Sequence, residues 1–422
     1  MANPVIGIIC LLLLSFYDPS LIIYRIGFVN EIALALIGLL FIANHDAILN
    51  LLFLPFKKGA ARLIYCAFWS SWALYFLVHS VVGLTSIGFA SSRLIRILFV
   101  ILFFLNIRKF WQFKIYLRLL ILLAVFYSVT SVLFHVVTQL SGVPNAVIVH
   151  VPVVDVDFAD LGIFGYMWPT NYRFPMRLAG VVIYRISSFF NESAAFAFFL
   201  EPILFYALFL RAQSKYKVSY TVACVIIICG LIASTSVAGL VSVLVSFVVL
   251  WLCRERSLLK KTFLGGFAVL VLYGFFQSGV GVLDDIVSTK QGTIELEATG
   301  LEHGLGLLHG FTLLVGSGYD FVRDDFYVSA NAFLSNLQRG GLLGLILFSS
   351  SVLLIIAQWW RIGFRKLMNE GGWVGFALLP NFVHLGIKVT YEFTFIYLIN
   401  FSLVFWYLVH IRAKNSTIVC SS

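Results

Sequence analysis

The chain has 422 residues, of which 61% are hydrophobic and 11% charged, with 42 Phe, 18 Tyr and 9 Trp and a formal net charge of +10. An average soluble domain is about 45–50% apolar and about 25% charged, so this composition excludes an ordinary soluble enzyme, a disordered chain, a fibre and a disulfide scaffold. The mean hydropathy of +0.99 predicts an all-α polytopic membrane protein, in which the sidedness of the charge matters more than its sum, and a nucleic-acid partner is not expected.

Apolar segments long enough to cross a bilayer follow one another along the chain, since about 20 apolar residues span about 30 Å of hydrocarbon. We predict twelve membrane spans, at 4–24, 26–44, 61–82, 90–107, 115–138, 191–210, 216–233, 235–253, 262–279, 340–358, 373–389 and 393–411. Asp18-Pro19-Ser20 interrupts the first of them. The stretch 46–56 is either an interfacial helix or part of a bent second span. A cleavable signal peptide is not expected, because the N-terminus lacks a basic region and a small-residue cleavage site.

The positive charges predict the orientation, because short loops rich in Lys and Arg stay in the cytoplasm. With both termini inside, 19 of the 29 Lys and Arg residues fall in cytoplasmic connections. The remaining 10 lie on the outer side, against the usual bias, and therefore require an explanation. The Cys and His residues have no spacing typical of a zinc site, so neither a metal nor another cofactor is expected.

We interpret residues 1–422 as a single membrane domain. Two of its predicted outer connections are long. They cover 139–190, the first long periplasmic loop, and 280–339, the second. Long loops in a compact bundle are usually functional or disordered, and the first is rich in aromatic residues and proline, which suit packing. We expect the chemistry to lie in these loops.

The first loop ends in a cluster of arginines, Arg173, Arg177 and Arg185, followed by Glu192 as the next span begins. A guanidinium group binds phosphate oxygens in a bidentate way, and a helix N-terminus adds free N–H groups. The cluster therefore predicts a site for a lipid diphosphate. The alternative is that these arginines snorkel to the interface or pair with acidic residues of the same loop.

The second loop carries the candidate bases for transfer of a sugar hydroxyl onto an anomeric carbon. A base near that hydroxyl is required, and the loop offers carboxylates and histidines; the candidates are His303, His309, Asp320, Asp324 and Asp325. Arg323 and Arg339 are candidates for stabilising the charge on the leaving diphosphate. A solvated or salt-bridged loop residue is the alternative interpretation for each of them.

One carboxylate, Glu201, falls inside a predicted span and is followed by Pro202. A carboxylate is costly in lipid, and proline frees a backbone carbonyl, so the pair indicates either a functional site or a kink with a hydrogen-bonded glutamate. His79 and His384 lie near predicted span ends, where packing is the more common role for histidine.

Two short stretches resemble the bacterial O-antigen and capsular polysaccharide polymerases, which share a superfamily with the O-antigen ligases. The stretch from Arg185 to Ala197 resembles the family's entry into a span after an outer loop. The stretch Asn331-Ala-Phe-Leu334, followed by Gly340-Gly-Leu-Leu-Gly344, resembles its exit from the large loop. The resemblance in architecture covers the whole chain.

This resemblance implies a glycosyltransferase C-like fold in the bacterial inner membrane. It also implies polymerisation of undecaprenyl-diphosphate-linked repeat units at the periplasmic face by block transfer, with membrane lipid and a chain-length regulator protein as further partners. Superfamily ligases carry a histidine just before the asparagine of the second stretch, where this chain has Val328, Ser329 and Ala330. That departure favours a polymerase over a ligase. A further family pattern, arginine followed by glycine eleven positions later, is absent from the outer-loop arginines.

Three other classes stay open: an O-antigen ligase, a flippase or secondary transporter for lipid-linked sugars, and a multi-span cell-wall polymerase. Transporters usually show a repeat between halves and a long central cytoplasmic connection, whereas the connection here is only 211–215.

The sequence hypothesis is therefore a polymerase in which Arg185 with Arg323 or Arg339 holds the diphosphate, supported by Arg173, Arg177, Glu192 and Asn331. The second loop then supplies the base.

Overall fold

The computed structural model describes residues 4–17, 29–53, 56–141, 176–178, 181–183, 188, 190, 193–254, 306, 308–319, 332–369, 372–387 and 394–419. The elements in these ranges are α1 (Pro4–Tyr17), α2 (Val29–Phe53), α3 (Phe56–Val81), α4 (Ile87–Asn106), α5 (Phe110–Ser141), β1 (Met176–Leu178), β2 (Val181–Ile183), α6 (Ser193–Gln213), α7 (Lys217–Ala233), α8 (Val237–Arg254), α11 (Phe311–Val315), α12 (Ala332–Ile362), α13 (Phe364–Asn369), the 3-10 helix η3 (Gly372–Phe376), α14 (Leu379–Ile387) and α15 (Phe395–Val419). The predicted span 262–279 lies outside them.

Seven of the helices in the described ranges are long and apolar enough to cross a membrane, as expected for a polytopic membrane protein. These spans are Ala61–Val81, Ile87–Asn106, Phe110–Leu133, Ser193–Gln213, Val237–Arg254, Ala332–Ile362 and Phe395–Ala413. The count of twelve stays a prediction. Of the two interpretations of 46–56, a continuation of the second span agrees with the structure, because α2 runs from Val29 to Phe53.

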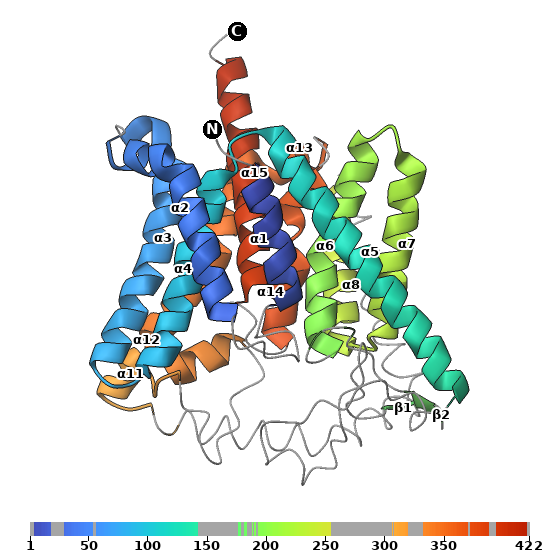
Figure 1. The fold of residues 1–422 in the computed structure, drawn as a ribbon, viewed down its shortest axis with the longest axis horizontal. Coiled ribbons are helices and arrows are strands. Elements are labelled where there is room, and N and C mark those ends of the chain that lie inside the picture. Colours follow the sequence, from blue (N-terminus) through green and yellow to red (C-terminus); the bar gives the residue numbers. More distant parts are fainter. Residues whose placement is uncertain are drawn as a thin grey trace.

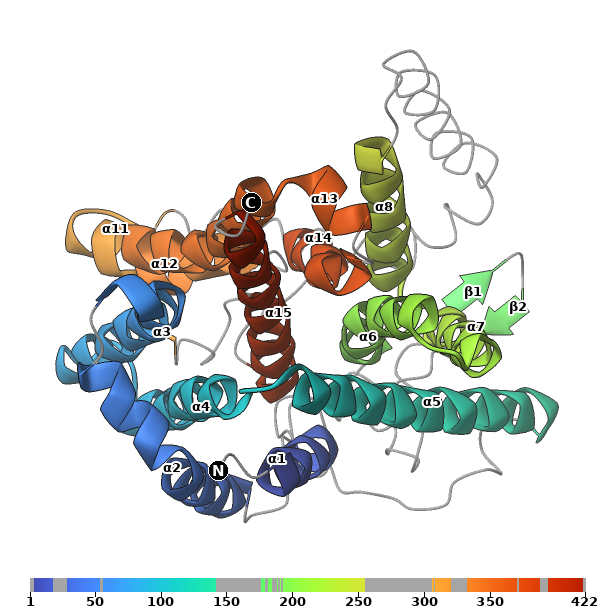
Figure 2. The ribbon, with the colours of Figure 1, turned by 90° about the horizontal axis from the view of Figure 1, so that it is seen from above.

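The helices form a bundle around α6 and α15 (Figures 1 and 2). Buried residues make up 94% of the apolar window of α6 and 83% of that of α15, against 28–50% in the other five spans. A helix that is apolar all round belongs in the middle of a bundle, and α6 has this pattern, with small residues such as Ala194 and Ala197 between large aromatic ones. These two helices form the core against which the others pack.

The two ends of the bundle differ in the charge of their connections. The connections 107–109 and 214–216, together with the α12–α13 junction at Gly363, lie at one end, and the basic residues around them are Arg108, Lys109, Lys114, Arg211, Lys215, Lys217, Arg361 and Lys366. We call this the basic end; it is the upper end in Figure 1, where both chain termini also lie. The connections 82–86 and 234–236 lie at the opposite end.

Helix α12 changes direction at Gly341, whose φ of 60° and ψ of −162° are not helical. A Cβ at this glycine would come 2.5 Å from the carbonyl carbon of Leu314, so α11 packs directly on the break. The Tyr75 hydroxyl donates to the Gly340 carbonyl oxygen at 2.7 Å on the other side. The Gly340-Gly341 pair therefore separates a short helical section, 332–340, from the spanning section of α12.

The predicted long loops contain some regular structure. Strands β1 and β2 form an antiparallel hairpin within the first loop, and its register places Arg177 opposite Val182. In the second loop, α11 and residues 332–339 of α12 are helical. The bounds predicted for the second loop, 280–339, stay a prediction.

Candidate functional site

A carboxylate, an imidazole and an amide meet in the interior of the bundle. Glu201 of α6 contacts His384 and Asn381 of α14, and all three side chains are fully buried. The Glu201 Oε1 atom pairs with His384 Nδ1, and Asn381 Nδ2 donates to Glu201 Oε2 at 3.0 Å. We call these three residues the Glu201 cluster.

The proline that follows Glu201 explains why an asparagine lies here. Pro202 has no N–H, so the carbonyl oxygen of Phe198, four residues earlier, loses its helical hydrogen bond. Asn381 Nδ2 donates to that oxygen at 2.9 Å. A side chain from a neighbouring helix thus satisfies the backbone group that the proline frees, as lipid-embedded helices require. The same amide group holds the carboxylate, so kink and cluster form one unit.

The cluster is tightly enclosed on the side of α8. A Cβ at Gly239 would come 2.5 Å from the Cβ of Ala197 and 3.5 Å from Glu201 Oε1. The Phe198 ring lies edge-on to the His384 ring with centroids 5.4 Å apart, and it also contacts Tyr397 of α15 at 6.0 Å. Electrostatic interactions in such a buried, aromatic surrounding are strong.

A second ionisable group, Arg96 of α4, is buried near the first turn of α15. Its side chain is 6% exposed, and the guanidinium carbon lies 5.2 Å from the ring centroid of Phe395. Arg96 is nine residues after the start of α4 and Glu201 eight after the start of α6. Both helices start at the end of the bundle opposite the basic end. The Arg96 and Glu201 positions therefore lie about 12 to 14 Å from that opposite end, measured along their helices. The first turn of α15 contacts Arg96 through Phe395, and it contacts Phe198, beside the Glu201 cluster, through Tyr397.

A third polar group fixes the chain before the predicted catalytic segment. The hydroxyl of Tyr319 donates to Asn336 Oδ1 at 3.1 Å, and its backbone N–H donates to Thr85 Oγ1 at 3.3 Å. A Cβ at the preceding residue, Gly318, would collide with the Leu84 carbonyl oxygen, and its φ of +103° favours glycine. The side chain of Tyr319 is buried. The segment that ends just before Asp320 is therefore held against the α3–α4 connection, 82–86, and against α12.

Three of the residues predicted from the sequence lie within the described ranges. His309 is exposed, and its backbone contacts Thr312, whose hydroxyl donates to the His309 carbonyl oxygen at 2.8 Å. Arg339 is half-buried in the short section of α12, and its carbonyl accepts a hydrogen bond from Gly318 at 2.9 Å. Arg177 lies in β1. The others lie outside the described residues: Arg173, Arg185, Glu192, His303, Asp320, Arg323, Asp324, Asp325 and Asn331. Their assembly into one site stays a prediction.

Sequence reasoning missed three of the residues that the structure brings forward. His384 was interpreted as a packing residue, whereas it pairs with Glu201; Arg96 and Asn381 were not singled out. Two signals were present: an arginine inside an apolar segment, and the unpaired carbonyl that Pro202 implies. Within the described ranges, no group of three or more His, Cys, Asp or Glu side chains is placed to hold a metal ion.

Neither protein-family models nor curated proteins gave a match to this sequence. A function for this protein is therefore inferred from its residues and from the resemblance of the two short stretches.

Proposed function

We propose that this protein polymerises undecaprenyl-diphosphate-linked oligosaccharide repeat units into O-antigen or capsular polysaccharide, with a glycosyltransferase C-like fold in the bacterial inner membrane. The observation that carries the proposal is the position of Arg96 and the Glu201 cluster at similar depth on either side of the first turn of α15. Ionisable residues inside a bundle mark substrate paths by default. In the proposal the basic end is cytoplasmic and the opposite end periplasmic, following the distribution of Lys and Arg.

The proposed reaction needs a cation for the diphosphate and a base for the acceptor hydroxyl. Arg96 supplies a guanidinium group inside the bundle, in addition to Arg185 and Arg323 or Arg339 from the loops. Glu201 holds His384 through Nδ1, the arrangement in which a carboxylate orients an imidazole for proton transfer through Nε2. The acceptor proton thus passes to His384, while Asp320, Asp324, Asp325 and His309 are the alternative bases that the sequence indicates.

Neutralising Arg96 is expected to lower the elongation rate about 10- to 100-fold, since a charge-assisted hydrogen bond contributes about 1.5–3 kcal/mol. The variant is Arg96→Gln, measured by the length of lipid-linked chains formed in proteoliposomes. Arg93→Gln is the matched control, because Arg93 lies three residues earlier, is half-buried and stacks on Phe89 at 4.5 Å. Equal elongation by Arg96→Gln and wild type would remove Arg96 from the site.

Replacing Arg185 by alanine is expected to abolish long chains while the protein stays in the membrane, because the loop arginine is predicted to hold the diphosphate. Polysaccharide gel profiles and the amount of protein in the membrane fraction are the two measurements. Normal chain lengths in the Arg185→Ala strain would refute that assignment.

A flippase or secondary transporter is the second candidate, favoured by the buried carboxylate–imidazole pair on the proline-containing helix α6. Such pairs also carry protons in transporters. One reconstitution separates the classes. Purified protein in liposomes receives a lipid-linked repeat unit, with and without a lipid A–core acceptor. Longer lipid-linked chains support the polymerase, translocation without elongation supports the flippase, and transfer only to the core acceptor supports a ligase.

A further inference from the structure

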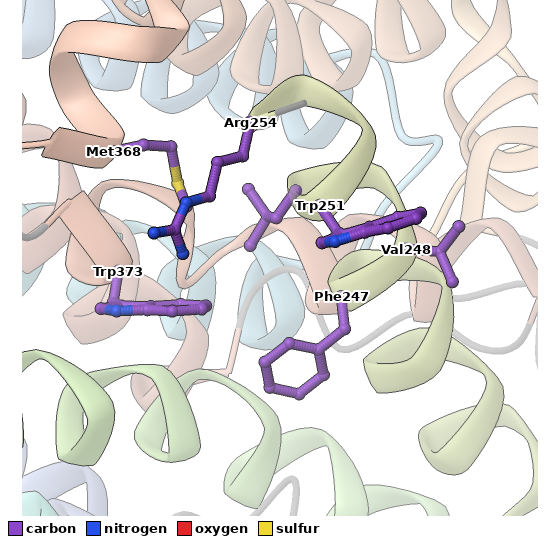
Figure 3. Close-up of a pocket in the computed structure, with 7 residues that line it drawn as sticks. Phe247, Val248, Trp251, Arg254, Met368 and Trp373 are labelled. Carbon is purple, nitrogen blue, oxygen red and sulfur yellow. The ribbon is translucent and has the colours of Figure 1, made fainter. Parts of the chain in front are cut away.

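A pocket of about 370 Å³ lies at the basic end, between the last turns of α8 and the segment formed by α13 and η3 (Figure 3). It is lined by Phe247, Val248, Leu250, Trp251, Arg254, Met368 and Trp373. Pockets for small ligands occupy about 300–1,000 Å³ and are mostly apolar, so this volume takes part of one acyl chain rather than a whole lipid. The pocket is far along α8 from Gly239, which contacts the Glu201 cluster.

The floor of the pocket is a rigid aromatic group. The Phe247 ring stacks on Phe205 of α6 at 5.3 Å and meets Trp373 edge-on at 6.0 Å. Aromatic rings packed on one another in this way keep an apolar surface in place. The indole of Trp251, which is 39% exposed among the described residues, forms the outward wall. The flexible end of an acyl chain fits such an apolar surface without any requirement for hydrogen bonds.

The charge in the lining lies at one end. Arg254 is the last residue of α8 and the one charged side chain in the lining; in Figure 3 its guanidinium group lies between Met368 and Trp373. Because α8 is a candidate membrane span, its last residue lies where hydrocarbon gives way to headgroups. An apolar pocket that ends in a cation at this level complements a molecule with an apolar chain and an anionic head.

We propose that this pocket binds an anionic glycerophospholipid, with one acyl chain against Phe247 and Trp373 and the headgroup phosphate on Arg254. The site lies at the end of the bundle opposite the proposed glycosyl transfer, and it extends beyond the proposed function. The proposed occupant is a lipid of the surrounding leaflet. When bound, this lipid holds the cytoplasmic ends of α8 and α13 together.

The test uses the full chain in phosphatidylcholine nanodiscs with increasing amounts of phosphatidylglycerol brominated on its acyl chains. Bromine quenches tryptophan at contact, so wild type should be quenched at a lower mole fraction of brominated phosphatidylglycerol than of brominated phosphatidylcholine. Replacing Trp251 and Trp373 together by phenylalanine should remove the part of the signal that saturates first, because these two indoles are the tryptophan reporters in the pocket lining. Equal quenching of wild type by the two lipids would overturn the proposal.

Two variants separate the headgroup from the chain. Arg254→Gln should raise the mole fraction for half-quenching about five-fold, the effect expected for one basic residue near an anionic headgroup. Val248→Phe should fill part of the pocket without adding a tryptophan and should reduce the early quenching while Arg254 stays in place. Arg361→Gln is the matched control, since Arg361 also ends a membrane helix, beside an 80% exposed Trp360, but does not line the pocket. An effect of Arg361→Gln as large as that of Arg254→Gln, or no effect of Val248→Phe, would contradict a specific site.

Discussion

Replacing Glu201 by glutamine is expected to lower chain elongation about 10²- to 10⁴-fold, the usual contribution of general acid–base catalysis, while the protein still folds and inserts. The amide has nearly the size of the carboxylate and keeps a hydrogen-bonding oxygen for Asn381. It carries no charge, however, and therefore cannot stabilise the protonated imidazole of His384. Elongation by purified protein in proteoliposomes is the measurement, with the unfolding midpoint in detergent as the check on folding.

Stability and activity measured together distinguish a catalytic role of the Glu201–His384 pair from a purely structural one. His384→Ala leaves a buried carboxylate without its imidazole, which costs about 3–5 kcal/mol when a buried ion pair loses one partner. Replacing Glu201 and His384 together by leucine removes both members of the buried pair and should be close to neutral for stability, yet inactive. A cluster with only a structural role would give the opposite result for activity: the stable double variant would elongate normally.

Tyr206→Phe is the control for a buried hydrogen bond on the same helix. The Tyr206 hydroxyl donates to Asn400 Oδ1 at 3.0 Å, away from the Glu201 cluster. Its removal should cost about 1 kcal/mol of stability and leave elongation unchanged.

If Glu201→Gln also elongates normally, the proton passes to one of the loop residues, and Asp320→Asn, Asp324→Asn, Asp325→Asn and His309→Ala identify which.

A β-branched residue at Gly341 is expected to destabilise the protein strongly. Its φ of 60° with ψ of −162° favours glycine, and a Cβ would come 2.5 Å from the carbonyl of Leu314, a backbone group that cannot turn aside. Strained backbone alone costs about 1–3 kcal/mol, and the displacement of α11 adds to it. Gly341→Val should therefore lower the unfolding midpoint markedly and Gly341→Ala somewhat less, both measured in detergent.

Gly38 provides the matched control for this prediction. It lies within the regular helix α2, and a Cβ there would meet nothing within 4 Å among the described residues. Gly38→Ala should be neutral or stabilising by up to about 1 kcal/mol, since alanine is the better helix former. If Gly341→Ala and Gly38→Ala unfold together with wild type, the break in α12 does not require glycine.

The amino-acid sequence alone is enough to predict that this is a membrane protein and roughly where the described spans lie. Both follow from runs of apolar residues, which are local properties of the chain, and a lipid-embedded backbone has few alternatives to a helix. The glycine pair at 340–341 and the Glu201-Pro202 step were also visible as unusual positions. Their spacing signalled that something occurs there, but did not say what.

The partners of these positions are defined only in the folded protein. Asn381 and His384 lie about 180 residues from Glu201, and no sequence period connects them. The amide that satisfies the Phe198 carbonyl and the aromatic ring beside Arg96 come from helices brought together by packing. Hydrogen bonds across helices depend on the rotation and depth of each helix, which the shape of the neighbouring side chains sets and which an apolar pattern leaves undetermined.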